Sequence, residues 1–275
     1  MRARRIAVAN QKGGVGKTTT SVNLAASLVA DGASVLLIDL DPQGNATMGS
    51  GVDKYDLQTS TYEWLVDDVP FDRVARHTEA GFDLVPANGD LTAAEGVLMA
   101  ADDRGTRLRM RLEATREFEF VVVDCPPSLN VLTLNALIAV DGVLIPLQCE
   151  YFPLEGLTDL LLTIRGVRER GNPGLAVEGI LRTMYDPRNR LSRDVSRQLL
   201  EYFGGDVYRT VIPRNVRLAE APSHGLPVIM YDRHCAGARA YRALAGEVRR
   251  AQGLRKRAEA ASAGSAGGAT PAVTV

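Results

Sequence analysis

The chain has few cysteines and contains no long apolar run. Its three cysteines, Cys125, Cys149 and Cys235, are odd in number and lack metal-ligand spacing, so neither a disulfide framework nor a zinc site is indicated. No run of about 18 or more uncharged apolar residues occurs, which excludes a membrane-spanning helix. The N-terminal segment, residues 1–5, is basic, and it leads into a short strand-like run and not into the apolar core of a signal peptide. We therefore expect a cytoplasmic protein with reduced thiols.

An excess of one charge is also missing. Lysines and arginines number 32 against 33 aspartates and glutamates, a formal net charge of −1, so no global field favours nucleic acid. Lysine itself is scarce: the chain has four, and two of them, Lys12 and Lys17, lie within six residues near the N-terminus. Apolar residues make up 45% and charged residues 24% of the chain. This is the usual balance for a protein that buries a core, and it excludes a largely disordered one.

Short apolar runs alternate with helical patterns along the 275 residues. Runs such as 35–38 and 121–123 are continuously apolar, which is typical of strands covered on both faces. The alternation predicts a single α/β domain over residues 1–257, with a doubly wound, mostly parallel sheet flanked by helices and no separate DNA-reading domain before it. Residues 258–275, rich in Ala, Gly, Ser and Thr, are expected to form a disordered tail. We expect strands at 5–9, 34–40, 82–86, 118–124, 142–147, 177–183 and 207–212, and helices at 17–31, 91–115, 131–140, 154–170, 192–203 and 236–252.

The clearest signal is a loop rich in glycine and lysine between the first strand and the first helix. It reads NQKGGVGKTTT over residues 10–20, in the strand–loop–helix context that a phosphate-binding loop requires. Glycines let backbone N–H groups turn toward phosphate oxygens, and the helix N-terminus adds the positive end of its dipole. Lys17 would reach the β- and γ-phosphates, and the Thr18 hydroxyl would bind Mg²⁺. The predicted nucleotide-binding residues are Lys12, Gly13, Gly14, Val15, Gly16, Lys17, Thr18 and Thr19.

The loop departs from the plain P-loop pattern at its start. Gln11 stands where that pattern places its first glycine, and Lys12 follows it. One interpretation makes Lys12 a solvated loop lysine. The other has it reach phosphates across a dimer interface, as an arginine finger does when it is supplied in trans.

Carboxylates stand at the ends of two predicted strands. Asp39 lies at the end of the strand at 34–40, Asp41 lies just past it, and Asp124 closes the strand at 118–124. Strand ends in open α/β sheets face the ligand crevice, so Asp124 is predicted to hold Mg²⁺ directly or through water. For Asp39 and Asp41 a second interpretation stays open, in which both merely cap the following turn.

Four segments in the correct order resemble one family. The segment KGGVGKTT, residues 12–19, is similar to the deviant Walker A motif of the ParA/Soj/MinD ATPases. DLDPQGN, residues 39–45, resembles the first switch of Soj-type ParA proteins, and VDCPPS, residues 123–128, resembles their Walker B motif and second switch. PRNVRLAEAPS, residues 213–223, resembles a segment diagnostic of the Soj branch. The resemblance covers nearly all of the chain before residue 258 and implies a ParA/Soj-type partition ATPase.

The resemblance assigns roles in hydrolysis to the acidic residues and to one loop. It implies that Asp41 positions the attacking water or takes its proton, and that Asp39 lies near Mg²⁺. Lys12, Lys17 and Asp41 are then the catalytic candidates, with Thr18, Asp39 and Asp124 as metal ligands. The loop at Glu150 and Tyr151 would meet the partner's nucleotide.

Contacts to the base are implied by the resemblance as well. Met184, after one strand, and Pro213, Arg214 and Asn215, after another, would contact it. The guanine-reading run Asn-Lys-x-Asp is absent, so ATP is favoured over GTP.

The family also implies partners and a cycle. Two protomers would close as an ATP-dependent homodimer that binds double-stranded DNA without sequence preference. A ParB/Spo0J-like protein would stimulate an otherwise weak ATPase and release the DNA, so that the protein is cytoplasmic and associated with the nucleoid. No membrane partner is expected.

A basic segment is the candidate DNA surface. Residues 182–217 hold eight arginines against four acids and few aromatics, which suits phosphate contacts on duplex DNA better than stacking on single strands. A solvated, salt-bridged face is the other interpretation, and the resemblance favours DNA. The leading candidates are Arg188, Arg214 and Arg217, followed by Arg249, Arg250 and Arg255.

Two rival functions remain open, and an iron–sulfur cluster is rejected. A MinD-like membrane-cycling ATPase would need an amphipathic C-terminal helix with large apolar residues, but residues 241–254 are poor in Leu, Ile and Phe. A P-loop ligase of the dethiobiotin-synthetase type would share the loop and leave residues 213–223 unexplained. Cys125 lies beside Asp124 without a second cysteine at cluster spacing.

Overall fold

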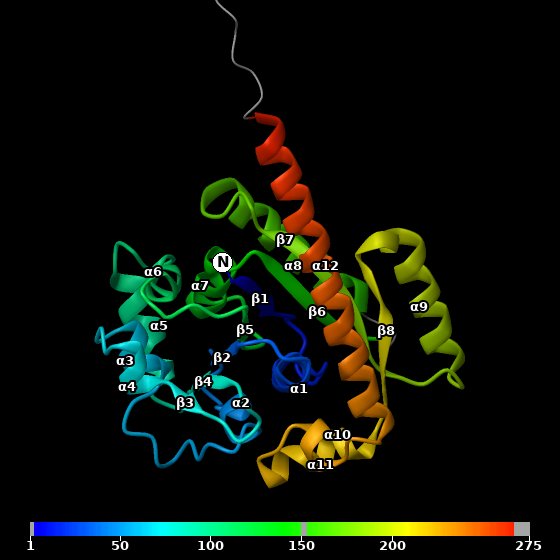
Figure 1. Cartoon of the computed structure of the whole chain (residues 1–275), viewed down its shortest axis with the longest axis horizontal. Helices are drawn as coiled ribbons and strands as arrows, with labels where there is room; N and C mark the ends of the chain where they lie inside the picture. Colours follow the sequence, from blue (N-terminus) through cyan, green and yellow to red (C-terminus); the bar gives the residue numbers. More distant parts are fainter. Residues whose placement is uncertain (1–2, 150–152, 267–275) are drawn as a thin grey trace, which may run out of the picture.

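The strands expected from the apolar runs form one sheet, shown in Figure 1. The computed structural model describes residues 3–149 and 153–266, and the predicted contact from Glu150 and Tyr151 lies outside them. In these residues the strand order is β3-β4-β2-β5-β1-β6-β7-β8. All neighbours pair in parallel except β3 with β4. The strands are β1 (Arg4–Val8), β2 (Val35–Asp39), β3 (Arg76–His77), β4 (Asp83–Val85), β5 (Phe120–Asp124), β6 (Gly142–Gln148), β7 (Ala176–Tyr185) and β8 (Val207–Pro213).

Helices cover both faces of the sheet. Successive residues of a strand point to opposite sides, and β2 follows this rule. Leu36 and Ile38 belong to a buried cluster with side chains of α5, α6, α7 and α8, whereas Val35 and Leu37 belong to another with side chains of α1 and α12. The continuous apolar run of β2 therefore reflects burial on both sides, as expected. The longer helices are α1 (Lys17–Ala30), α5 (Leu91–Ala100), α6 (Arg107–Glu113), α7 (Val131–Ala139), α8 (Pro153–Arg170), α9 (Arg190–Phe203) and α12 (Ala236–Ala266).

The prediction of one helix over residues 91–115 is wrong in one respect, because the structure has two helices there, α5 and α6. The buried side chain of Asn135 donates to the carbonyl oxygen of Arg104 at 2.5 Å and accepts from the backbone N–H of Leu108 at 3.2 Å. Gly105 lies so close to α7 that an added Cβ would stand 2.9 Å from Ile138 Cδ1. A tertiary contact therefore interrupts a segment whose own pattern favours a continuous helix.

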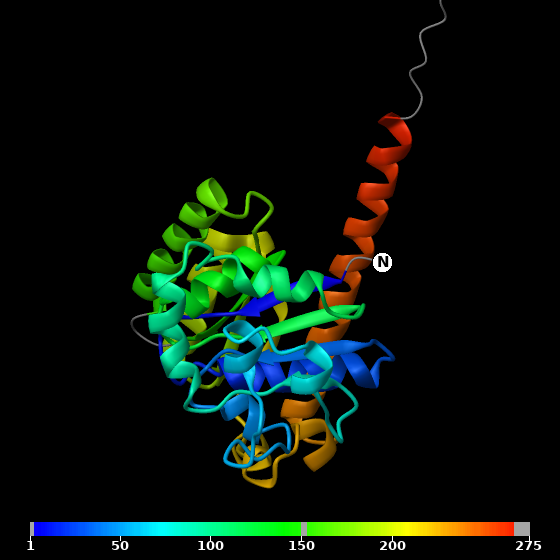
Figure 2. The same ribbon diagram turned by 90° about the vertical axis from the view of Figure 1, so that its left-hand side faces the viewer.

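The last helix is longer than its pattern predicts. It was expected to end at residue 252, and α12 continues to Ala266 and projects away from the sheet (Figure 2). Alanine, arginine, lysine and glutamate dominate residues 255–260, and all four are strong helix formers. The expected disordered tail, residues 258–275, is thus helical up to Ala266, and residues 267–275 lie outside the described part. The domain boundary near residue 257 stays a prediction.

Short helices that no periodicity could reveal connect the main elements. Each spans four or five residues, too few for a helical repeat. Among them, α2 follows β2, and α10 and α11 follow β8. In the described residues no helix has the length and apolar content to cross a bilayer. The short helices are α2 (Asn45–Met48), α3 (Thr61–Leu65), α4 (Phe71–Val74), α10 (Val216–Glu220) and α11 (Val228–Tyr231), with 3₁₀ turns η1 (Gly204–Asp206) and η2 (Ala221–His224).

Candidate nucleotide-binding site

The carboxyl ends of three central strands meet at one edge of the sheet. Asp124 of β5 pairs in register with Asp39 of β2 on one side and with Val8 of β1 on the other. The chain leaves β1 at this edge and enters α1 through the glycine-rich loop. The register therefore brings both strand-end carboxylates beside the loop, as the sequence predicts.

The glycine-rich loop adopts a backbone that requires glycine. Gly14 and Gly16 have φ values of +73° and +88°, in the left-handed region that costs other residues free energy. The Asn10 side chain anchors the loop, since its Nδ2 donates to the Pro146 carbonyl oxygen at 2.7 Å and its Oδ1 accepts from the Lys12 N–H at 3.0 Å. Thr183 Oγ1 donates to the Val15 carbonyl oxygen at 2.8 Å. The loop shape is thus fixed by residues of β6 and β7.

The two loop lysines differ in environment. Lys17 is buried, and its Nζ donates to the Lys12 carbonyl oxygen at 3.1 Å. Burial lowers the pKa of Lys17, while the nearby carboxylates of Asp124 and Asp41 act in the opposite direction. Lys12, by contrast, is exposed, as are Gly13 and Gly14. Lys17 is therefore positioned inside the loop, and Lys12 lies on its outer surface.

Asp124 accepts two hydrogen bonds from hydroxyl groups near the start of α1. Thr18 Oγ1 and Ser21 Oγ each donate to it at 2.8 Å. Sequence reasoning found Thr18 and missed Ser21, although the spacing of three residues on a helix places both hydroxyls on one face. Asp124 is fully buried, and burial together with the neighbouring Asp39 raises its pKa to about 8.

Asp39 and Asp41 hold the backbone that follows β2. Asp39 accepts from the Thr47 N–H at 2.9 Å, from Thr47 Oγ1 at 2.7 Å and from the Asp41 N–H at 3.1 Å. Asp41 accepts from the Gln43 N–H at 3.0 Å. Both carboxylates therefore cap the following turn, and their roles in hydrolysis and metal binding stay predictions. Sequence reasoning missed Thr47, because nothing local marks a threonine eight residues away as a partner.

The donor set fits Mg²⁺. Thr18, Asp39 and Asp124 offer only oxygen atoms, which this hard cation prefers. Burial raises the pKa of Asp39 to about 7 and that of Asp124 to about 8. Two such buried carboxylates repel each other when both are ionised. A divalent cation would relieve this repulsion, so the electrostatics of the site favour one.

Next to the glycine-rich loop lies a cavity of about 240 Å³. Met184, at the end of β7, has a φ of +49°, which is a strained conformation for a residue with a side chain and typical of functional sites. Tyr241 of α12 is buried there, with its hydroxyl 3.1 Å from Thr20 Oγ1. Sequence reasoning missed Tyr241, because its contact depends on the packing of α12 on α1. The cavity brings together the predicted base contacts: it is lined by Gly16, Thr19, Thr183, Met184, Ile212, Pro213, Arg214, Asn215, Leu218, Ala219 and Tyr241.

The basic segment does not form one uniform surface. Arg182 is buried in β7, where its guanidinium donates to Ser196 Oγ and to the Tyr208 carbonyl oxygen, both at 2.9 Å. This arginine is structural, and the sequence could not separate it from the others. Its strand lies between β6 and β8 and not at an edge.

The three leading DNA candidates do lie at the surface, near the ends of β7 and β8. Arg188 forms an ion pair with Asp186 at 2.9 Å. Arg188 and Arg214 both lower the pKa of Asp186, to about 2, chiefly through the Arg188 side-chain hydrogen bond. Arg217 pairs with Glu220 at 2.7 Å. Among the second group, Arg249 donates to the Asp31 carbonyl oxygen, and the side chain of Arg255 is outside the described part.

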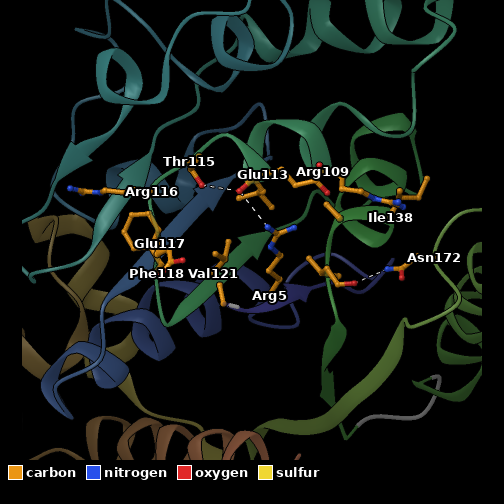
Figure 3. A pocket seen from close by; sticks show the side chains of 14 residues that line it. Arg5, Arg109, Glu113, Thr115, Arg116, Glu117, Phe118, Val121, Ile138 and Asn172 are labelled. Carbon is orange, nitrogen blue, oxygen red and sulfur yellow. Dashed lines mark hydrogen bonds between the residues drawn. The ribbon is translucent and has the colours of Figure 1, made fainter. Parts of the chain in front are cut away.

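A larger cavity, of about 520 Å³, lies at the opposite, amino end of the strands (Figure 3). Arg5 of β1, Val121 of β5, Phe118 and Asn172 line it, and Arg5 Nη2 donates to the Leu112 carbonyl oxygen at 3.3 Å. Of the predicted nucleotide, metal and DNA residues that the structure describes, none lines this cavity. Cavity size alone therefore does not identify the functional site.

A parallel sheet with a glycine-rich loop between its central strand and a helix, and with carboxylates ending the neighbouring strands, defines a P-loop nucleotide-binding protein. A family model described as an AAA domain matches residues 3–177. Chromosome partitioning protein ParA of Caulobacter vibrioides is 51% identical over 249 residues, covering 89% of this chain and 93% of that protein. Sporulation initiation inhibitor protein Soj of Bacillus subtilis is 51% identical over 245 residues, covering 88% and 97%.

A solved structure supports the fold assignment. Cobyrinic acid a,c-diamide synthase of Mycobacterium smegmatis, with bound ADP and magnesium, superposes with a TM-score of 0.79 at 39% identity, covering 90% of this chain and 94% of that chain. The family model and the two partitioning relatives show that the chain belongs to the ParA/Soj family of chromosome-partitioning ATPases. This confirms the resemblance and the predicted fold class.

Proposed function

We propose that this chain binds ATP and Mg²⁺ at the glycine-rich loop and hydrolyses ATP in a cycle that controls its affinity for DNA. The observation that carries the proposal is the hydrogen bond from Thr18 to Asp124, which joins the start of the P-loop helix to the end of β5. This bond supports a phosphate and Mg²⁺ site here, because it brings a hydroxyl and a carboxylate together beside the glycine-rich loop. The ADP and magnesium bound to the similar Mycobacterium smegmatis structure support this assignment.

Each residue of the site has a proposed role. Lys17 binds the β- and γ-phosphates, and the loop N–H groups surround the phosphate oxygens. When bound, Mg²⁺ neutralises charge on those oxygens, and Thr18, Asp39 and Asp124 would hold it. Asp41 orients the attacking water or takes its proton; it lies just past β2 at the same edge. Met184 and the segment 213–215 enclose the base.

Dimerisation is proposed to complete the site. Lys12, Gly13 and Gly14 are exposed at the outer surface of the loop, where a second protomer can approach closely because the two glycines carry no side chain. Lys12 of each protomer then stabilises phosphates held by the other. This role requires the lysine to act in trans, so it is lost in a monomer.

The closed dimer is proposed to bind duplex DNA through arginines of both protomers. Arg214 lines the nucleotide cavity, and Arg188 and Arg217 are exposed on the segments that follow β7 and β8. Phosphate contacts from such arginines need no base recognition. A ParB/Spo0J-like protein stimulates hydrolysis, which is slow without it, and hydrolysis releases DNA. The location is then cytoplasmic and nucleoid-associated.

Light scattering with ATP tests the dimer and the role of Lys12 together. Asp41→Ala should form an ATP-dependent dimer, whereas Asp41→Ala combined with Lys12→Ala should stay monomeric while still binding ATP. Equal dimerisation of both variants would overturn the trans role. Sedimentation with anionic lipid vesicles tests the MinD-like alternative, which predicts ATP-dependent membrane binding in place of DNA binding.

A further inference from the structure

Two glycines from distant parts of the chain meet backbone to backbone. A Cβ added to Gly225 would stand 2.9 Å from the Gly51 Cα, and one added to Gly51 would stand 3.0 Å from the Gly225 carbonyl oxygen. Both residues have left-handed φ values, +82° for Gly51 and +65° for Gly225, which side-chain-bearing residues rarely adopt. A side chain at either position would therefore strain the backbone, and at position 225 it would also clash with Gly51.

Gly51 is tied to the nucleotide site through α2. Its N–H donates to the Met48 carbonyl oxygen at 3.1 Å, at the end of that helix. Within α2, Thr47 donates twice to Asp39, and the Gly44 N–H just before α2 donates to the Asp41 carbonyl oxygen at 2.9 Å. The run from Asp39 to Gly51 is thus a continuous hydrogen-bonded segment. A shift of the acidic loop would move Gly51 with it.

Gly225 is tied to the candidate DNA surface in a similar way. It caps η2, and its N–H donates to the Pro222 carbonyl oxygen at 3.0 Å. The turn η2 continues directly from α10. The Asn215 side chain caps the start of α10 by accepting from the Arg217 N–H at 3.0 Å. Arg214 lies just before α10 and Arg217 lies within it, so both belong to the same continuous stretch of chain as η2 and Gly225.

Apolar side chains and one further hydrogen bond also join these elements. Asn23 of α1 accepts from the Val228 N–H at 2.7 Å, which tethers the start of α11 to the P-loop helix. Between these tethers lies a cavity of about 460 Å³, whose walls include Thr18 of α1, Asn45 of α2 and Ser223 of η2. The glycine contact is the point at which the backbone just after α2 directly meets the backbone of the segment from α10 to α11. That segment lies beside α2 in both views (Figures 1 and 2).

We propose that the Gly51–Gly225 contact transmits the state of the nucleotide site to the arginine-bearing segment, residues 214–231. Because no side chain stands between the two backbones, no rotamer change can absorb a displacement of α2. Movement of the Asp39–Asp41 loop on nucleotide exchange then repositions Arg214 and Arg217 relative to DNA phosphates. This regulation rests on the proposed function.

Hydrogen exchange of backbone amides tests the coupling without DNA. In the wild type, replacing ADP with a non-hydrolysable ATP analogue should change exchange in residues 41–51 and in residues 214–231. In Gly225→Ala the first segment should still respond and the second should not. A wild-type response confined to residues 41–51, or an unchanged response of residues 214–231 in Gly225→Ala, would overturn the proposal.

Gly32→Ala is the matched control. Gly32 also has a left-handed φ, +84°, but no atom lies within 4 Å of an added Cβ, so this variant introduces backbone strain without a clash. It should behave as the wild type in both segments. Gly51→Ala provides a second test of the same contact, and thermal unfolding checks that each variant folds. If neither glycine variant folds, the wild-type exchange still tests the proposal, because a response confined to residues 41–51 would overturn it.

DNA retention gives the functional readout. Gly225→Ala should bind the ATP analogue as the wild type does and yet lose about 10-fold in DNA affinity of the ATP state, a typical coupling between two sites. Equal DNA affinity in a folded Gly225→Ala would contradict the proposal. Failure of the wild type to bind DNA in any nucleotide state would instead refute the proposed function, and the exchange experiment would still report on the coupling.

Discussion

The Thr18 hydroxyl donates to the Asp124 carboxylate at 2.8 Å. The two residues come from the first turn of α1 and the last position of β5. Because β5 lies beside β1 in the sheet, this bond closes the phosphate-binding loop against the neighbouring strand. It links the element that would hold phosphates to the carboxylate that would hold the cation.

Lys17→Ala should abolish nucleotide binding. Lys17 is buried within the loop and makes its hydrogen bond to the Lys12 carbonyl oxygen, so its ammonium group is positioned where phosphates would bind. Isothermal titration with ATP and Mg²⁺ measures the loss. Lys256→Ala, which removes a lysine far from the loop in sequence, serves as control. Retained ATP affinity in Lys17→Ala would contradict the assigned role.

Asp41→Ala should bind ATP and DNA but hydrolyse ATP about 100-fold or more slowly, the usual cost of removing a group that handles a proton. It should accumulate as an ATP-bound dimer in gel filtration. Asp56→Ala, which alters an exposed aspartate in the following loop, should turn over normally. Normal turnover by Asp41→Ala would refute its catalytic assignment.

Thr47→Ala should lower the free energy of unfolding by about 1–3 kcal/mol, because it leaves buried polar groups unpaired. The Thr47 hydroxyl donates to Asp39 and accepts from the Ala87 N–H at 2.8 Å. Urea unfolding measures the change. Thr47→Ser keeps the hydroxyl and should recover most of the stability; an equal loss in both variants would show that the methyl group, and not the hydrogen bonds, matters.

Metal-free protein should lose stability as the pH rises from about 4 toward 8. Burial raises the pKa of Asp39 to about 7 and that of Asp124 to about 8, so the folded state binds more protons than the unfolded state in this window. The stabilising contribution is complete at low pH and is lost as the pH passes the folded pKa values. Mg²⁺ with ADP should therefore raise the melting temperature more at pH 8 than at pH 6.

Calorimetry in EDTA and in Mg²⁺–ADP measures this difference. Asp124→Asn cannot titrate at that position and should show a flatter pH dependence in EDTA. A pH-independent effect of Mg²⁺ on the wild type would argue against cation binding by these carboxylates.

Arg217→Glu should leave the ATP-dependent dimer intact and weaken DNA binding. Arg217 is exposed and pairs with Glu220 at 2.7 Å and with Asp232 at 3.7 Å, so reversal of its charge creates a local acidic cluster that repels phosphates. Arg165→Glu is the control, since Arg165 also lies exposed and paired, on α8. Fluorescence anisotropy with a random duplex measures both, and equal affinities would place the DNA surface elsewhere.

The core of the site could be predicted because its signals are local. The loop, Lys17 and Thr18 follow one another in the chain, and Asp39 and Asp124 each end an apolar run. Parallel strands align their carboxyl ends, so strand-end acids converge without further information. The four motifs then supplied the family, which the comparisons confirm.

What the sequence missed depends on contacts between distant elements. Thr47 reaches Asp39 only because α2 folds back on β2, and Tyr241 reaches the nucleotide cavity only because α12 packs on α1. Arg182 looked like a member of a basic face, and its strand turned out to be internal. Ser21 is different, because its spacing from Thr18 on the helix could have revealed it.

Retention of the protein on random duplex DNA, measured with ATP, with ADP and without nucleotide across a salt series, tests directly whether the nucleotide controls DNA binding. We expect retention with ATP alone, falling steeply as salt increases because the contacts are to phosphates. The absence of DNA binding in every nucleotide state, or equal binding in all three, would contradict control of DNA binding by the nucleotide.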